Sequence, residues 1–214
     1  PRWQYTTLQQ PIHGFGDWCV PNRDPKIAEV CFGGKLTGGV LDTSVGVPFN
    51  TNEGVETNNI MFTSLWDNFP DSIAVDVEGK ARHAYLLMAG STNHMQSRFV
   101  NGVVSVLYKD GTSDELELKN PDTWVPIEQD FYLDEYAYKV DTPKPYRVLL
   151  NDGRCSRNLT KDLGLKMKAK RMIEGGAAVL LDLPLDAEKE IDKLVLKTTA
   201  YEVIIGLMGI TLVN

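Results

Sequence analysis

Hydrophobic and polar positions alternate along most of the chain in short segments, and turn-forming residues separate these segments. A period of two residues predicts strands rather than helices. The predicted strands, which either alternate or are short apolar runs between turns, are 60–65, 73–77, 84–89, 100–108, 113–118, 137–140, 146–150, 177–183, 194–199 and 203–213. The sequence therefore predicts an all-β protein, an antiparallel β-sandwich of the jelly-roll type.

The clearest pair of strands surrounds Asp110-Gly111. An Asp-Gly dipeptide between two strand patterns predicts a tight hairpin with a type I′ turn, which requires positive φ at both central residues. Alternation then assigns faces to the side chains of both arms. In the first arm Val104, Val106 and Tyr108 are expected to share one face, and in the second arm Leu116 and Leu118 are expected to share one face.

The last segment, 203–213, is apolar at both alternating sets of positions. A strand of this kind is covered on both faces. We expect it to be a central strand on which the fold depends. Its predicted faces are Ile204, Met208, Ile210 and Leu212 on one side, and Val203, Ile205 and Leu207 on the other.

The remaining segments add less regular structure. Residues 1–58 are rich in Gly, Pro and polar turn residues, and we expect a loop-rich portion packed on the sandwich. Residues 90–94 follow an apolar run and are expected to form a loop. Only 159–173 has a helix-compatible composition, and it lacks a steady helical period. No break in composition divides the chain, so we expect one domain over 1–214.

Composition narrows the function classes. The 214 residues carry a net charge of −7, which disfavours binding to a phosphate backbone. Segment 203–213 is too short to span a bilayer, and no other apolar run near the C-terminus is longer. The cysteines are Cys19, Cys31 and Cys155; their number is odd and they form no zinc pattern. Three reduced thiols are expected, with a Cys19–Cys31 bridge as the alternative.

Several stretches also carry a family resemblance: 89–98, 108–112, 120–130, 174–178 and 203–212. They resemble a family of uncharacterised C-terminal domains in bacterial polysaccharide-degrading proteins, over roughly residues 30–214. The resemblance implies a galactose-binding-like jelly roll that lies beside glycoside hydrolase domains of a longer chain. It also implies a secreted or periplasmic location, and it supplies no catalytic residue.

Sugar recognition uses aromatic faces against the C–H faces of pyranose rings, and planar polar groups that bond the hydroxyls. Three segments offer these groups, and we expect them to form a glycan site if they meet at one end or on one face of the sandwich. The candidate ligand-binding residues are Trp66, Asp67, Asn68, His94, Gln96, Arg98 and Trp124. Each has a structural alternative: a tryptophan packs in the core, Arg98 pairs with a carboxylate, and His94 is a hydrogen-bonded structural histidine.

Two further chemistries stay open. The carboxylates Glu128, Asp130, Asp134 and Glu135 would serve a glycosidase only if two of them faced each other across a cleft. A structural calcium ion would find oxygen ligands at Asp67, Asn68 and Asp71. No motif for a nucleophilic serine, a phosphate-binding loop or a zinc protease is present.

These observations predict a non-catalytic accessory or carbohydrate-binding module of a larger glycan-processing protein. Its partners would be a glycan or oligosaccharide and the neighbouring domains of a longer chain. One alternative is a glycoside hydrolase that uses a carboxylate pair near Glu128 and Asp130. The other is an interdomain interaction module without a ligand.

Overall fold

The computed structural model describes residues 39–50, 60–66, 69–92, 96–127, 140, 143–150, 152–165, 173 and 176–214. It also describes the backbone of three short strands, β1 (Thr7–Leu8), β2 (Pro21–Asn22) and β3 (Leu36–Thr37). β1 pairs with β2 in a two-stranded sheet. The predicted strand 137–140 lies almost entirely outside the described residues.

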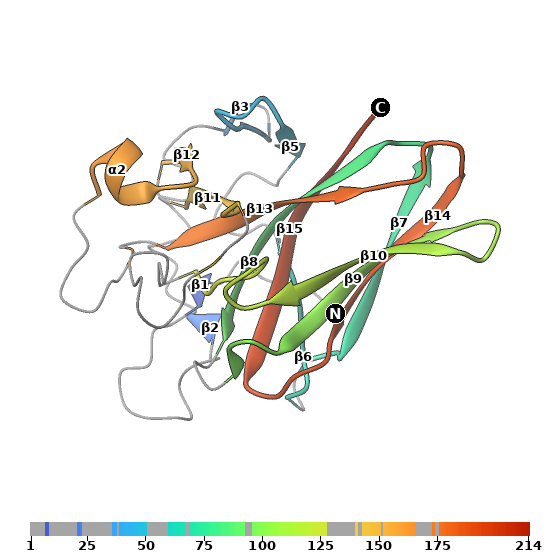
Figure 1. The fold of residues 1–214 in the computed structure, drawn as a ribbon, viewed down its shortest axis with the longest axis horizontal. Helices are drawn as coiled ribbons and strands as arrows, with labels where there is room; N and C mark the ends of the chain where they lie inside the picture. Colours follow the sequence, from blue (N-terminus) through green and yellow to red (C-terminus); the bar gives the residue numbers. More distant parts are fainter. Residues whose placement is uncertain are drawn as a thin grey trace.

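Two antiparallel sheets form a sandwich (Figure 1). The four-stranded sheet has the order β10-β9-β14-β7, and the six-stranded sheet has the order β12-β11-β13-β8-β15-β6. The strands of the first are β7 (Ser72–Gly79), β9 (Val100–Tyr108), β10 (Ser113–Lys119) and β14 (Ile191–Thr198). Those of the second are β6 (Met61–Ser64), β8 (His83–Thr92), β11 (Tyr146–Leu149), β12 (Cys155–Ser156), β13 (Ala177–Pro184) and β15 (Val203–Val213).

This architecture confirms the prediction of an all-β antiparallel sandwich. Successive strands cross between the layers at β7–β8, β8–β9, β13–β14 and β14–β15, as strands of a jelly roll do. At one end of the sandwich, the hydroxyls of Thr63 on β6 and Thr198 on β14 form a buried hydrogen bond of 2.7 Å. This bond joins the two layers directly.

The six-stranded sheet is covered on both faces. Its inner face packs against the four-stranded sheet through alternate residues of β8, β13 and β15, such as Leu86, Leu181 and Ile205. Its outer face carries a second buried cluster, which includes Leu87 and Ile204. The central strands β8 and β15 therefore contribute apolar side chains in both directions, as the sequence predicts for 203–213.

A small sheet covers part of the outer face. It has the order β3-β4-β5, with β4 at Val40–Asp42 and β5 at Pro48–Asn50. Leu41 and Phe49 are fully buried in the outer cluster. The Thr211 hydroxyl of β15 donates to the Pro48 carbonyl, which fixes β5 next to the C-terminal half of β15.

One predicted set of faces is wrong in part. The register of β15 against β8 shifts between Leu207 and Gly209, because a bulge adds one residue to β15. Side chains beyond the bulge change faces. Ile210 and Leu212 therefore pack with Val203, Ile205 and Leu207 on the inner cluster, whereas Ile204 and Met208 lie in the outer one.

The β9–β10 hairpin is confirmed, with Ser113 opposite Leu107, but its predicted type I′ turn is wrong. Gly111 alone among the turn residues has positive φ, at 86°. The Asp110 carboxylate accepts hydrogen bonds from the Thr112 amide at 2.9 Å and the Thr112 hydroxyl at 2.6 Å. These bonds stabilise a longer loop that needs only one left-handed residue. Val104, Val106, Tyr108 and Leu118 are buried in the inner cluster, and Leu116 is partly buried against it.

Two other boundaries differ from prediction. The expected loop at 90–94 begins later, because β8 continues to Thr92. Helix α2 is short, Leu159–Leu163; the Asn158 side chain caps its first turn, and Gly164 ends it with φ of 64°. Residues 166–172 of the predicted helical stretch lie outside the described part. Within the described residues, no helix is both long and apolar enough to cross a bilayer.

The close packing of Trp124 against β8 leads to the first prediction. A Cβ atom at Gly90 would lie 2.2 Å from the Ile204 carbonyl oxygen and 2.5 Å from the Trp124 ring. We expect Gly90→Ala to lower the free energy of unfolding by about 3 kcal/mol or more, because backbone cannot move aside cheaply. Urea unfolding measures this value.

Gly209→Ala is the matched control, because the nearest atom to its Cβ would be in the Phe49 side chain at 3.1 Å, and the nearest backbone atom, the Asn50 carbonyl oxygen, would lie at an ordinary 3.6 Å. Its expected cost is clearly smaller. Equal stability losses for the two variants would contradict the assigned packing of Trp124.

Candidate functional site

An open groove of about 500 Å³ lies at the side of the sandwich where β11 begins. Residues from both sheets and from the turn between β4 and β5 line it. The lining residues are Val45, Val47, Tyr85, Leu116, Asp122, Thr123, Pro143, Lys144, Pro145, Tyr146, Arg157, Leu180, Leu181 and Asp182. This volume falls within the range of small-ligand sites.

The groove passes around a sheet edge. Leu180 belongs to the outer cluster and Leu181 to the inner one, so a groove lined by both reaches both faces of β13. The pairing of β11 with β13 stops at Tyr146 opposite Leu180. Pro145 and Pro143 precede Tyr146, and a proline has no amide hydrogen with which to continue a ladder. The two prolines thus keep β11 from starting before Tyr146, and the groove lies beside the part of β13 that β11 does not reach.

Tyr85 of β8 has a fixed orientation at the groove. Its ring stacks on the His83 ring, with centroids 5.8 Å apart and an interplanar angle of 17°. The Nδ1 atom of His83 lies 2.8 Å from Oδ1 of Asp182 on the neighbouring strand. Asp182 is opposite Tyr85 in the register, so the three side chains lie on the same face. They form a polar and aromatic wall on the outer face of the sheet.

Tyr146 and Arg157 form a second wall. The guanidinium carbon of Arg157 lies 4.5 Å from the centroid of the Tyr146 ring. This geometry is a cation–π contact, which holds the arginine head above the ring. Tyr146 is the first residue of β11, and Arg157 follows β12, so the β11–β12 pairing brings them together.

Asp122 and Lys144 complete the charged lining. The Asp122 carboxylate accepts a hydrogen bond from Arg98 at 3.2 Å. Lys144 also has an interaction partner. Both positions come from turns rather than strands, Asp122 from the turn after β10 and Lys144 from the segment before β11. The groove therefore combines two carboxylates, two cations, two tyrosines and an apolar floor.

The sequence-predicted site residues do not gather at this groove. Trp124 is 0% exposed; its Nε1 donates to the Thr92 hydroxyl at 2.7 Å, and its ring fills the space between the sheets. No face of the indole is open to a sugar, so Trp124 is a core residue here. Trp66 is half-buried and packs against the outer cluster.

Of the predicted site loop at 94–98, the structure describes residues 96–98. Gln96 is half-buried, and its carbonyl accepts from the Asn101 side chain at 2.9 Å. Arg98 is exposed, has positive φ of 67°, and bonds Asp122 at the groove, which is the carboxylate pairing expected as its structural alternative. Other predicted residues lie outside the described part of the chain: Asp67, Asn68, His94, Glu128, Asp130, Asp134 and Glu135.

The calcium hypothesis stays a prediction. Of its three proposed ligands only Asp71 is described, and its carboxylate accepts a 3.4 Å hydrogen bond from Ser72. Among the described residues, no group of three or more His, Cys, Asp or Glu side chains is arranged to hold a metal ion.

The sequence reasoning missed Tyr85, Tyr146, Arg157 and Asp182. Three of them lie within or at the start of strands, where the period-two pattern assigns them only to a polar face. The usable signal was the Pro143-Lys144-Pro145 segment, because two prolines before a strand predict an interrupted sheet edge.

Cys155 lies near this region and is a free thiol in the described structure. Burial raises the pKa of the thiol to about 11. The reactive thiolate is therefore scarce at neutral pH, and a nucleophilic role is disfavoured. Cys19 and Cys31 lie outside the described residues.

No protein-family model matches the chain, and no curated protein matches it significantly.

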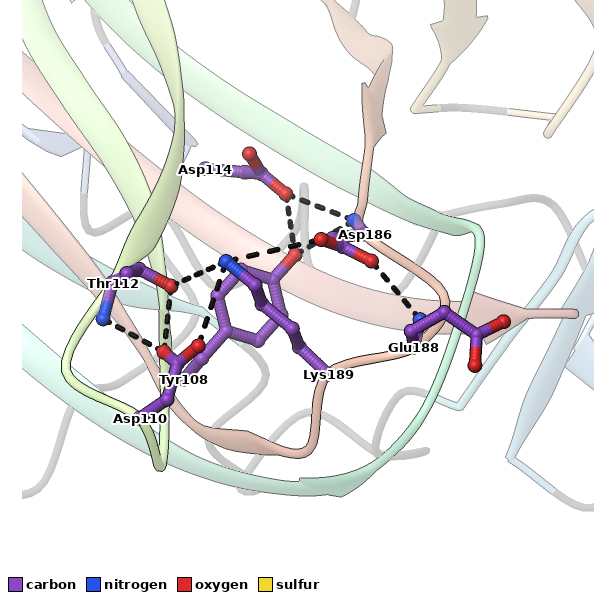
Figure 2. A network of polar contacts seen from close by, with 7 residues as sticks. All are labelled: Tyr108, Asp110, Thr112, Asp114, Asp186, Glu188 and Lys189. Atoms are coloured by element: carbon purple, nitrogen blue, oxygen red, sulfur yellow. Dashed lines mark hydrogen bonds and ion pairs between the residues drawn. The ribbon is translucent and has the colours of Figure 1, made fainter.

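A second concentration of polar side chains joins the β9–β10 hairpin to the connection between β13 and β14 (Figure 2). The Tyr108 hydroxyl donates to the Asp114 carboxylate and accepts from the Asp186 amide at 2.9 Å. The same amide lies 3.0 Å from the Asp114 carboxylate. These bonds link β9, β10 and the segment after β13.

Lys189 occupies the other side of this network. Its Nζ atom donates to the Thr112 hydroxyl at 2.8 Å and lies 3.5 Å from Asp110 and 3.8 Å from Asp186. Figure 2 shows the lysine head between the hairpin and the opposite segment. The network satisfies its own charges and donors, so we interpret it as structural rather than as a ligand site.

This network generates a pH prediction. Burial, reinforced by the bond to Asp114, raises the pKa of the Tyr108 hydroxyl from 10.0 to about 12. The folded protein therefore holds this proton more tightly than the unfolded chain does. The resulting stabilisation is complete below pH 10 and is lost as the pH rises towards 12.

Tyr108→Phe should remove roughly 1–2 kcal/mol of stability below pH 10, the worth of a hydrogen bond to a charged group. Urea unfolding of both proteins across this pH range provides the measurement. The stability difference should shrink towards pH 12. A difference that stayed constant with pH would contradict the assigned proton.

Proposed function

We propose that the chain is a non-catalytic carbohydrate-binding module of a larger glycan-processing protein. The observation that carries the proposal is the open groove of about 500 Å³, with two tyrosines, two carboxylates and two cations along an apolar floor. Sugar rings present apolar C–H faces and many hydroxyls, and these groups are complementary to such a lining.

The geometry suggests how binding would work. His83 supports one face of Tyr85, and Arg157 covers one face of Tyr146, so both rings have restricted orientations. A restricted ring loses little entropy when it packs against a ligand. Asp122 and Asp182 offer carboxylate oxygens that accept hydrogen bonds from sugar hydroxyls. A groove open to solvent favours modest affinity and an oligosaccharide that enters from the side.

The sequence resemblance supports the same proposal. Galactose-binding-like domains in bacterial polysaccharide-degrading proteins have a β-sandwich fold and lie beside catalytic domains. In this setting the protein would be secreted or periplasmic and would hold a glycosidase near its substrate. A fold alone does not determine function, so the argument rests on the groove.

An interaction module without a ligand is the second candidate. Phe99 and Tyr201 are 62% and 71% exposed, and the Thr199 amide bonds the Asn101 carbonyl at 2.9 Å, which joins their two segments. Exposed aromatic side chains at one end of a domain are typical of a docking surface. This end lies far along β8 from Tyr85 of the groove. Thr92, paired with Val203, lies seven residues along β8 from Tyr85, or roughly 23 Å.

A glycan array on the intact chain tests the proposal. We expect binding to at least one class of oligosaccharide, and Tyr85→Ala and Tyr146→Ala should each weaken it by about tenfold or more, equal to ~1.4 kcal/mol. Tyr146→Phe keeps the ring and should retain most of the binding.

Tyr201→Ala is the matched control, because this tyrosine is exposed at the other end of the sandwich. Thermal unfolding of each variant checks that it folds. The groove is the wrong site if Tyr201→Ala abolishes binding while the other two variants bind normally. Absence of binding to any glycan would reject the module and favour the docking role.

A further inference from the structure

The charged residues along the groove do not all have the same kind of partner. Asp122 pairs with Arg98 at 3.2 Å, and Asp182 pairs with His83 at 2.8 Å. Lys144 also has a partner. Both carboxylates are therefore already engaged with donors of the protein itself.

Arg157 differs from these residues. Its guanidinium lies over the Tyr146 ring, and it forms no ion pair with any carboxylate in the part of the chain that the structure describes. Its side chain is exposed. Arg154, three positions earlier, shows the usual alternative, because its Nε lies 2.7 Å from the Asp152 carboxylate.

Stacking uses the face of a guanidinium and leaves its edge available. The N–H groups lie in the plane of the group, and their fork matches the two oxygens of a carboxylate. A ring beneath the guanidinium fixes that plane before a ligand arrives. Arg157 thus presents an oriented set of donors at a groove whose other charges are engaged.

We propose that the groove binds glycans that carry a carboxylate, such as uronic acids, and that Arg157 is the carboxylate-binding residue; this rests on the proposed function of the groove. The net charge of −7 limits the ligand class further. A densely anionic polymer is repelled by the molecule as a whole, whereas a glycan with an isolated carboxylate meets this repulsion least and can place that one group at the guanidinium of Arg157. Sparsely charged acidic oligosaccharides fit both conditions.

Paired probes test this inference. Neutral oligosaccharides that carry a single galacturonic, glucuronic or mannuronic acid residue are compared with their methyl esters, which have nearly the same shape and no charge. We expect the acid form of at least one to bind about tenfold or more tightly than its ester, as a charge-assisted bidentate contact would give. Added salt should reduce this preference, because the groove is open to solvent.

Arg157→Gln should abolish the preference for the acid form, and Arg157→Lys should restore part of it, because a lysine keeps the charge without the planar fork. Arg154→Gln is the control, since it makes the same change in charge at an arginine already paired with Asp152. It should leave the preference intact.

Two results separate this inference from the proposed function. Binding of neutral glycans or esters as tight as that of the acids, or a preference for acids that survives Arg157→Gln, overturns the carboxylate site and leaves the binding module standing. Failure to bind any glycan, neutral or acidic, overturns both.

Discussion

The pairing of β8 with β15 is the constraint on which the rest of the structure depends. These strands are paired over ten positions, from Thr92 opposite Val203 to His83 opposite Val213. Both carry buried apolar side chains on both faces. A sheet with this centre must be covered twice, by the four-stranded sheet on one side and by β4 and β5 with further segments on the other. The sandwich and its additional outer layer follow from that requirement.

The groove forms where the six-stranded sheet is incomplete. β13 extends to Pro184 beside β8, whereas β11 begins only at Tyr146, after two prolines, and leaves part of β13 without a described partner strand. At the end of this pairing and beyond it, residues on both faces of β13 line the groove, Leu180 from the outer cluster and Leu181 from the inner one. The apolar floor and the polar walls of the groove come from this one interruption, so the core and the candidate site share an origin.

The sequence predicts the layers better than the site. Two-sided apolarity identifies β15, and Asp-Gly identifies the β9–β10 hairpin, because both signals are local. Trp124 misleads, since an indole between two prolines has the same local pattern whether it faces a ligand or fills a core. The contact of Arg157 with Tyr146 depends on β11 pairing with β12, which no local pattern specifies. The bulge in β15 also could not be predicted, because the strand is apolar at both sets of alternating positions and a shift of one residue leaves that pattern unchanged.

Hydrogen–deuterium exchange of the intact chain tests the central pairing most directly. The account predicts that the amides of 86–89 in β8 and 204–207 in β15 exchange only on global unfolding and are the slowest in the protein. The amides of β7, at the edge of the four-stranded sheet, should exchange faster. Rapid exchange in 204–207, or slower exchange in β7 than in β15, would contradict a fold built outward from these two strands.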